Sequence, residues 1–435
     1  MNVFLIVVDS LRLDFAGELL SGLKRRGFRV YERAVAASNW TIPSFGSMLT
    51  GLYPSLHGGH EEGDRVFPVR WGDMVSCRLG ELGFHPVVLT ENLLLSPAYG
   101  FKCFEVWEYF NWWFFVFKLS REEYGRAIGE FVRNGNNAVR AGLSLLRQGR
   151  LGLLSKLFVN YLAYRAVALR RGPVDRCSRC IIRDVTKIKT PAFVVVNFME
   201  AHEPYTYTEL GTPYLPTYDF VEMFREGRAP RELVDLWRRW YPRAVGLASR
   251  RVFELLDVLE DGGLLDDSLV VVASDHGQLL GEFGLVGHLA LLSDELVRVP
   301  LAVRFPSGVE VVGGGGSGWV SNTAVKRLVL EVARGVRRFD EGVLYSDVVF
   351  SETFGLGFTS WPRVCRDGGC RLLPKRRVAV YKGDFKLVYN VTDGVVEEVR
   401  GYGGRPDGDV AGDLLREVFG FLKVAEGLQF SPEGL

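Results

Sequence analysis

Ser274-Asp275-His276, followed twelve residues later by His288, is the part of this sequence that points most directly to chemistry. It comes directly after Leu269–Ala273, an uninterrupted apolar run that predicts a buried β-strand. A carboxylate and an imidazole at the end of such a strand, with a second imidazole on the next loop, are typical ligands of zinc and related divalent cations. The pattern therefore predicts a metal site.

Two other predicted strands end in residues of the same kind. Val3–Val8 is followed by Asp9, and Ala192–Phe198 is followed closely by Glu200 and His202. Because the carboxyl ends of parallel strands lie at one edge of a sheet, these side chains are expected to gather there. Glu200 is the weaker candidate, since an acid at a strand end is often simply solvated.

Thr41 lies just before a predicted helix. Pro43 is favoured at a first helical position and Gly51 ends the pattern, so a helix is expected over 43–49. Free backbone amides and the helix dipole at such an N-terminus favour anions. A hydroxyl held there beside a divalent cation can ionise and act as a nucleophile. The alternative is that Thr41 or Ser44 only caps the helix. We favour the nucleophile because the predicted metal ligands lie in the same sheet.

Strand and helix patterns alternate along most of the chain. This alternation predicts an α/β fold with a mostly parallel sheet between helices, which would form a catalytic domain over residues 1–345. Strands are expected at 3–8, 28–35, 86–90, 192–198, 269–273 and 301–305, and helices at 14–26, 43–49, 71–82, 232–260 and 322–334.

Residues from about 108 to 185 differ in character from the alternating segments. They begin with the aromatic run Phe110–Phe117 and continue with helical patterns rich in arginine. We interpret them as a helical cap inserted into the sheet domain. Such a cap could admit a glycan- or lipid-linked substrate or rest on a membrane surface. The alternative is a helical layer packed on the sheet with its arginines turned to solvent.

The last ninety residues predict a smaller, β-rich C-terminal subdomain over 346–435. Tight-turn residues at Lys382-Gly383-Asp384 connect two of its strands as a hairpin. Strands are expected at 348–352, 377–381, 385–389 and 394–399, and a final helix at 409–426.

Bulk composition limits the function classes. With 435 residues, 47% of them apolar, the chain can bury a large core, and its net charge of +1 argues against a general nucleic-acid binder. No apolar stretch approaches the roughly 18 residues of a spanning helix, and no charged leader precedes the first strand. We therefore expect a cytoplasmic protein. The oligomeric state is left open.

The cysteines are expected to be mainly structural. Cys177 and Cys180 have the spacing of a redox or zinc motif, but no second such pair accompanies them. Cys365 and Cys370 flank a turn that would let them bridge. The sequence leaves open whether any of these thiols form disulfides.

Several segments resemble the sulfatase family of the alkaline phosphatase superfamily. The resemblance implies an alkaline-phosphatase-like core with a mixed, mostly parallel sheet, one or two divalent metal ions (zinc, manganese, magnesium or calcium) and a covalent intermediate. It rests on Asp9–Arg12, Thr41–Gly58, Met199–Tyr205, Ser274–Gly277, Gly284–His288, Val297–Leu301 and Tyr381–Leu387, which occur in family order.

The sequence departs from true sulfatases at the nucleophile. Thr41 stands where those enzymes have a Cys or Ser that is oxidised to formylglycine, and Phe45 replaces the family's arginine four positions on. Threonine cannot give that aldehyde because its β-carbon already carries a methyl group. The pair Asp275-His276 is similar to phosphodiesterase, phosphonate-hydrolase and phosphoethanolamine-transferase branches, some of which use a plain threonine. Phosphate is therefore favoured over sulfate.

The resemblance and the strand-end positions together imply a first metal site. Its expected ligands are Asp9, Thr41, Asp275 and His276.

Four further residues are expected to complete the active site. His202 and His288 either bind a second metal or stay metal-free, where they would contact the substrate oxyanion or move a proton. Asn92 is expected to contact the substrate, with a turn residue as the alternative. Arg12 is expected to pair with a carboxylate of the site or with the substrate.

The resulting prediction is a metal-dependent hydrolase of phosphate or sulfate esters that forms a covalent adduct on Thr41, with phosphodiesters favoured. Its substrate would be an anionic ester, possible carriers being a glycan or a lipid. One alternative is a transferase that moves a phosphorylated head group onto a glycan or lipid. The other is a non-catalytic binding protein built on a hydrolase fold.

Overall fold

The computed structural model describes most of the chain. The described residues are 1–62, 65–70, 72–109, 138–171, 177–203, 227–288, 291–314, 318–355, 375–403 and 408–429, with residues 205, 223 and 316 and a few positions between 123 and 134. Within these residues, no helix combines the length and the apolar character needed to cross a bilayer.

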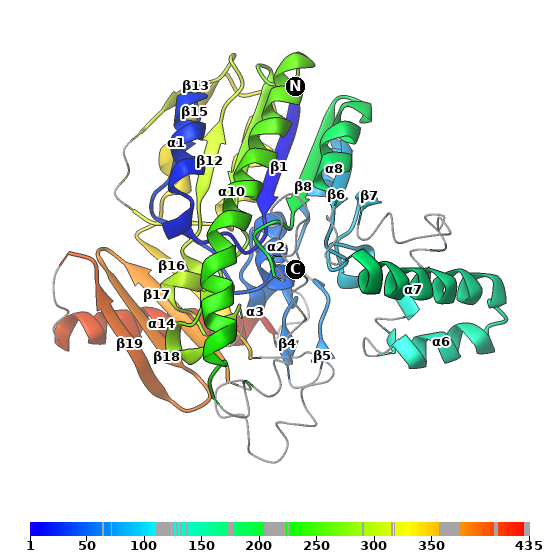
Figure 1. Cartoon of the computed structure of the whole chain (residues 1–435). Helices are drawn as coiled ribbons and strands as arrows, with labels where there is room; N and C mark the ends of the chain where they lie inside the picture. The colour runs from blue at the N-terminus through cyan, green and yellow to red at the C-terminus, as the bar shows by residue number, and fades with distance from the viewer. Residues whose placement is uncertain are drawn as a thin grey trace.

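A seven-stranded sheet forms the centre of the molecule (Figure 1). The five strands from β9 to β7 pair in parallel, whereas β12 runs antiparallel to both β9 and β2. The predicted mixed, mostly parallel α/β sheet is confirmed. Its order is β2 (Arg29–Val30), β12 (Leu301–Arg304), β9 (Ser268–Ala273), β1 (Asn2–Val8), β8 (Ala192–Phe198), β6 (His85–Thr90) and β7 (Glu105–Glu108).

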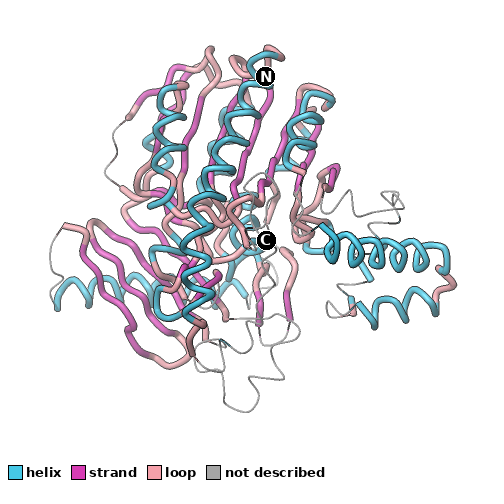
Figure 2. The backbone as a smooth tube through the Cα atoms, viewed as in Figure 1, coloured by secondary structure: helices cyan, strands magenta, loops and turns pink. Residues whose placement is uncertain are grey.

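Helices cover both faces of the sheet, as Figure 2 shows. Because side chains alternate along a strand, β1 serves two separate apolar cores. Phe4, Ile6 and Val8 pack on the side of α1 (Gly17–Arg25), α8 (Ser178–Asp184) and α10 (Arg231–Asp261). Val3, Leu5 and Val7 pack on the side of α2 (Thr41–Thr50), α4 (Val75–Glu81) and α12 (Ala324–Ala333).

Two predicted elements differ in the structure. The strand expected over 28–35 is wrong as a single element, because Glu32 and Arg33 form a turn that separates β2 from β3 (Ala34–Val35). β3 leaves the main sheet and pairs with β14 (Val320–Ser321). Helix α2 begins at Thr41 and not at Pro43. A proline is tolerated at the third helical position because that amide has no partner within the helix.

The C-terminal residues form an antiparallel sheet that carries α14 (Gly408–Gln429), so the predicted β-rich subdomain is present. The sheet contacts the core at Asp294, which accepts a 2.8 Å hydrogen bond from Tyr381 and lies 3.2 Å from the Lys386 ammonium. The domain boundary between residues 345 and 346 stays a prediction. The strands are β16 (Val348–Thr353), β17 (Arg377–Lys382), β18 (Phe385–Asn390) and β19 (Val395–Gly401).

The inserted region contains helices, including α6 (Ala138–Arg147), α7 (Leu151–Arg171) and α8. The aromatic run at 110–117 lies outside the described residues. Cys77 is bonded to Cys103, and Cys177 is bonded to Cys180. Positions 365 and 370 also lie outside the described residues.

Candidate metal centre and active site

The carboxyl ends of four neighbouring strands carry the candidate residues. β1 ends beside Phe198 of β8 and Ala273 of β9, and β6 ends beside Asn197 of β8. Asp9 continues the ladder by donating its amide to the Phe198 carbonyl over 2.8 Å. The parallel register therefore brings residues that are far apart in sequence to one edge of the sheet, as predicted.

Asp9, Asp275 and His276 form a compact cluster at this edge. Nε2 of His276 lies 3.3 Å from Oδ2 of Asp275 and 3.6 Å from Oδ1 of Asp9. One potential ligand atom from each residue lies within 4.8 Å of the other two, and all three side chains are fully buried. Two carboxylates and one imidazole are a donor set that zinc and other divalent cations accept.

The protonation pattern of this cluster fits a cation. Nδ1 of His276 donates to the Gly277 carbonyl over 2.9 Å, so Nε2 of the neutral ring carries a lone pair. Nε2 of His276 and Oδ2 of Asp275 are buried, and neither atom has a hydrogen-bond partner among the described residues. Electron-rich atoms that face one another in a dry site repel unless a cation or a proton lies between them. The backbone contact on the far side of the ring is the usual means of fixing a metal-binding tautomer.

Ser10 links the two aspartates. Its φ of 61° is in the left-handed region, which non-glycine residues rarely adopt. In this conformation the amide donates to Oδ1 of Asp275 over 3.2 Å and the hydroxyl donates to Oδ1 of Asp9 over 3.0 Å. Strain of this kind persists where surrounding contacts enforce it and is concentrated at functional sites.

Thr41 is the first residue of α2 and faces the same cluster. The N-cap is Trp40, and no side chain caps the helix, so the capping alternative for Thr41 is not observed. Oγ1 of Thr41 lies 3.5 Å from the amide nitrogen of Asn92. The hydroxyl of Ser44 instead donates to the Asp275 carbonyl and accepts a 2.8 Å hydrogen bond from Asn322. Thr41 thus shares the side-chain nitrogen of Asn92 with Asp9, whereas Ser44 contacts the backbone of Asp275.

Asn92 lies in a turn, and its side chain also contacts the candidate site, while contact with the substrate stays a prediction. Its backbone amide donates to Thr90 Oγ1 over 2.8 Å and its side-chain oxygen accepts from Leu94, which is turn geometry. Its side-chain nitrogen donates to Oδ2 of Asp9 over 3.0 Å and approaches Thr41. The turn therefore holds an amide donor between a candidate ligand and the candidate nucleophile.

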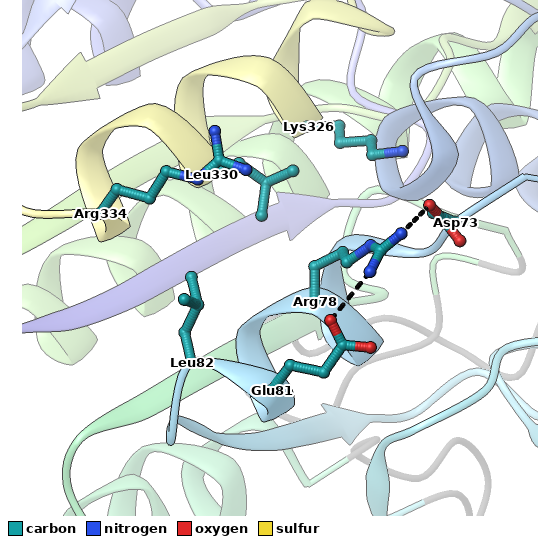
Figure 3. Close-up of a pocket in the computed structure, with 7 residues that line it drawn as sticks. All are labelled: Asp73, Arg78, Glu81, Leu82, Lys326, Leu330 and Arg334. Atoms are coloured by element: carbon teal, nitrogen blue, oxygen red, sulfur yellow. Dashed lines mark hydrogen bonds and ion pairs between the residues drawn. The ribbon is translucent and has the colours of Figure 1, made fainter.

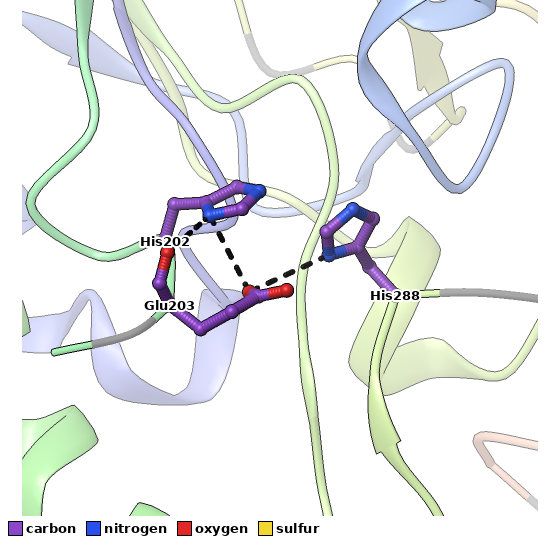
Figure 4. A group of neighbouring side chains, drawn as sticks. All are labelled: His202, Glu203 and His288. Atoms are coloured by element: carbon purple, nitrogen blue, oxygen red, sulfur yellow. Dashed lines mark hydrogen bonds and ion pairs between the residues drawn. The ribbon is translucent and has the colours of Figure 1, made fainter. Parts of the chain in front are cut away.

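His202 and His288 lie next to this cluster with Glu203. The ring centroid of His288 is 4.5 Å from that of His276 and 5.0 Å from that of His202. Oε2 of Glu203 lies 3.4 Å from Nδ1 of His202 and 3.8 Å from Nδ1 of His288. Figure 4 shows Glu203 beneath the two rings, whose other nitrogens point away from it. Nδ1 of His202 donates to the backbone carbonyl of Glu203 over 2.7 Å, and the Glu203 carboxylate lies on the Nδ1 side of both rings.

Gln278 contacts both Glu203 and His288. Neither Gln278 nor Glu203 was predicted from the sequence as a site residue. The Gln278 amide nitrogen donates to Glu203 over 2.7 Å and to the Tyr205 hydroxyl over 3.0 Å. Its oxygen therefore accepts from Nδ1 of His288 at 3.0 Å, which leaves Nε2 of His288 without a proton in the neutral ring. The available signal was position, because Glu203 directly follows His202 and Gln278 follows the Asp-His pair by two residues.

Electrostatics separate the two aspartates. Burial raises the pKa of Asp9. The nearby histidines and the Asn92 amide lower it by more than burial raises it, so the pKa of Asp9 ends below its usual value. Burial and the charge of Asp9 raise the pKa of Asp275 well above its usual value. The protein groups alone therefore do not support two ionised carboxylates here, whereas a divalent cation would.

In the neighbouring group, Glu203 favours its ionised form and His288 favours its neutral form. Burial raises the pKa of Glu203, but His202, His288 and the Gln278 amide outweigh it and lower that pKa to about 2. Burial lowers the pKa of His288 to about 3. An ionised glutamate thus accompanies a neutral His288 ring, which can accept a proton at Nε2.

Arg12 is not brought to the cluster. Its guanidinium lies 2.7 Å from Asp14 and 2.7 Å from Glu282, and it donates to the Gln278 carbonyl over 3.1 Å. The expected pair with a carboxylate of the site is not observed, since Asp14 and Glu282 lie outside the cluster, and contact with the substrate stays a prediction. With its donors used in this way, Arg12 supports the loop that contains Gln278.

A separate surface pocket of about 370 Å³ lies between α4 and α12 (Figure 3). Arg78 in this pocket is paired with Asp73 and Glu81, and Lys326 donates to the Thr50 carbonyl over 3.0 Å. None of the predicted site residues lines it. The pocket is therefore distinct from the candidate active site.

Comparison with known proteins gives distant relatives. The chain aligns over 324 residues with the low-salt glycan biosynthesis sulfotransferase Agl7 of Haloferax volcanii at 25% identity, which covers 73% of this chain and 58% of that protein. It aligns over 139 residues with the uncharacterized sulfatase YidJ of Escherichia coli at 28% identity, which covers 27% of each. The chain thus spans less than two thirds of the length of both relatives. No protein-family model matches the chain.

Among solved structures, the phosphonate monoester hydrolase of Silicibacter pomeroyi has a similar fold. The TM-score is 0.61 at 16% identity, and the match covers 97% of this chain and 94% of that one. At this identity the likeness concerns the fold, including the central sheet and the C-terminal antiparallel sheet. The chain is thus similar in sequence to proteins named as a glycan biosynthesis sulfotransferase and a sulfatase, and similar in fold to a phosphonate monoester hydrolase.

Proposed function

We propose that this chain is a metal-dependent hydrolase that cleaves phosphate or sulfate esters through a covalent adduct on Thr41, with phosphodiesters favoured. The observation that carries the proposal is the single amide of Asn92, which lies 3.5 Å from the Thr41 hydroxyl and 3.0 Å from Asp9. It joins a candidate nucleophile to the buried cluster of unsatisfied ligand atoms.

Asp9, Asp275 and His276 would hold the cation, with Thr41 beside it. A bound dication would lower the pKa of the threonine hydroxyl and offset charge on the group being transferred. Thr41 Oγ1 would attack phosphorus or sulfur, and the bond to the leaving ester oxygen would break. The Asn92 amide and the free backbone amides at the start of α2 are suited to donate to the nonbridging oxygens.

Release of the adduct requires a base, and His288 is suited to that role. Its Nδ1 donates to Gln278, so Nε2 is the ring atom that would take a proton from an attacking water. The water oxygen would bond to phosphorus or sulfur, and the Thr41 oxygen would leave. His202 lies beside His288 and is a second candidate for this proton transfer or for contact with the substrate oxyanion.

Threonine chemistry supports phosphate over sulfate. The β-carbon of Thr41 carries a methyl group and cannot become the aldehyde hydrate by which formylglycine sulfatases eliminate their product. A threonine adduct must be released by attack on phosphorus or sulfur, as in enzymes that form phosphorylated side chains.

A transferase is the second candidate. It is favoured by the alignment with Agl7, a protein named as a glycan biosynthesis sulfotransferase. The same adduct on Thr41 would then pass to an acceptor hydroxyl instead of water. A glycan or lipid alcohol would take the place of the water that His288 deprotonates.

A substrate panel tests these proposals. Protein loaded with zinc, manganese, magnesium or calcium is assayed with bis(nitrophenyl) phosphate, nitrophenyl phosphate and nitrophenyl sulfate, with and without an added alcohol acceptor. The hydrolase proposal predicts the fastest release of nitrophenol from the diester. Faster cleavage of sulfate would contradict the phosphate preference, product on the acceptor would support the transferase, and no turnover with any ester would favour a binding protein.

A further inference from the structure

Large apolar side chains are concentrated on the surface of one helical hairpin. The hairpin consists of α6, α7 and the connecting residues 148–150, and we call it the arm. Half of the large apolar side chains that the described part of the chain exposes lie on it. They are Val139 (73% exposed), Leu143, Leu146, Leu151 (62%), Phe158 (60%), Tyr161 and Leu162.

These side chains are separate from the arm's own core. Leu145 and Leu153 are 1% and 6% exposed, and α6 approaches α7 closely where Gly142 faces Leu154. The exposed residues at 139, 143 and 146 recur at helical spacing on another side of α6, and those at 151, 158 and 162 do so on α7. Each helix therefore has an inner apolar side used for packing and an outer one that is exposed.

The charged side chains of the arm are all basic over residues 138–162. Residues 138–162 include Arg140, Arg147, Arg150 and Lys156 and no acidic residue. Arg147 and Arg150 are exposed at the end of the hairpin.

Two nearby acids, Glu123 and Glu130, bind side chains of the arm. Glu123 lies 2.6 Å from the Lys156 ammonium. Glu130 accepts hydrogen bonds from Ser144 over 2.8 Å and from Gln148 over 2.7 Å. In the described part of the arm, the partners of these two acids are Lys156, Ser144 and Gln148, and they do not include Arg147 or Arg150.

We propose that the arm docks on the surface of an anionic lipid bilayer. Figure 1 shows α6 and α7 extending away from the body of the molecule, beyond β7, where a flat surface can reach them. Apolar side chains beside arginines suit the boundary between acyl chains and negative head groups. None of the described helices is suited to span a bilayer, so the arm would lie on the membrane. This inference does not depend on the proposed catalytic activity.

Vesicle flotation with the full-length protein tests the inference. One vesicle set is phosphatidylcholine alone and the other is an equal mixture of phosphatidylcholine and phosphatidylglycerol. The wild type is expected to float with the mixed vesicles and to be released by high salt. The triple variant Leu143→Gln, Leu146→Gln, Phe158→Gln should bind at least about tenfold more weakly. The double variant Arg147→Gln, Arg150→Gln should lose roughly fivefold for each arginine, and only on anionic vesicles.

A matched control uses exposed apolar residues outside the arm. Val395→Gln, Val396→Gln and Val424→Gln make the same chemical change at positions that are 48%, 41% and 57% exposed, and binding should be unchanged. Equal melting temperatures of all variants show that folding is intact. The inference is overturned if the wild type ignores anionic vesicles or if arm and control variants bind equally. It is also overturned if the arm variants instead convert a dimer to a monomer, because a second copy would then cover this face.

Discussion

The side-chain nitrogen of Asn92 lies 3.5 Å from Oγ1 of Thr41, and the same nitrogen donates to Asp9 over 3.0 Å. A residue after β6 thus joins the start of α2 to the end of β1. No regular backbone pairing connects β6 with α2, so a side chain makes this link. This arrangement predicts how substitutions near the site change activity and stability.

Replacement of the nucleophile should stop turnover without unfolding the protein. Thr41→Ala is expected to lower kcat by about three orders of magnitude or more, because it removes the hydroxyl that would form the adduct. Thr41→Ser should keep measurable activity. The control is Thr50→Ala at the other end of α2, where the hydroxyl bonds only to the backbone of Gly46 and Leu52. Normal turnover by Thr41→Ala would show that another group attacks the ester.

Metal binding should stabilise the fold through the buried carboxylates. At a cation concentration about 100 times the dissociation constant, the free energy of unfolding should rise by about 2.7 kcal/mol. Asp275→Asn should abolish most of this gain, since it removes a charged ligand from the cluster. Titration of chelator-treated protein, followed by thermal unfolding, measures the effect. The exposed acid Asp73 supplies the control substitution Asp73→Asn, and an equal loss in both variants would argue against the site.

Gln278 should act by positioning His288 and Glu203. Gln278→Leu keeps much of the side-chain volume but removes both polar contacts, so activity should fall by about 10- to 100-fold while the cation still binds. Paired measurement of kcat and of metal affinity separates this effect from a loss of ligands. A variant that loses the metal as well would show that Gln278 supports the cluster and not the histidine alone.

His57 should make the fold sensitive to acid. Burial lowers its pKa from 6.5 to about 3, and Nδ1 accepts a hydrogen bond from Gly59, so the folded state disfavours protonation. The unfolded state then binds more protons between these two values, and stability falls as the pH drops through this window, by at most about 5 kcal/mol.

The test of this sensitivity is the variant His57→Gln, which can keep a donor toward the Pro43 carbonyl. Its stability should depend less on pH between 6.5 and 3. Urea unfolding at a series of pH values gives both curves. Parallel curves for the wild type and the variant would mean that His57 does not titrate in this way.

The metal cluster was predictable because each strand is a continuous apolar run that ends in a ligand. Asp9 follows such a run directly and Asp275 follows one after Ser274, and parallel pairing then fixes where they meet. The contacts of Arg12 were not predictable, because Glu282 is 270 residues away and only loop packing brings it near. The same holds for Gln278 and Glu203, whose loops follow different strands.

The segment 28–35 shows a second limit. Phe28, Val30, Tyr31 and Val35 favour extended structure, and a strand was predicted on that basis, but Glu32 and Arg33 form a turn. Which sheet each half joins depends on partners elsewhere in the chain, namely β12 for β2 and β14 for β3. The local pattern predicted neither this turn nor the pairing of the two halves.

The most direct test of the central claim is anomalous diffraction from crystals grown with zinc or manganese. The account predicts one strong anomalous peak at roughly 2 Å from carboxylate oxygens of Asp9 and Asp275 and from Nε2 of His276, with the Thr41 hydroxyl in the same coordination sphere. No peak at these ligands, or a peak there with the Thr41 oxygen more than about 6 Å away, would contradict it, because direct ligation requires bonding distance.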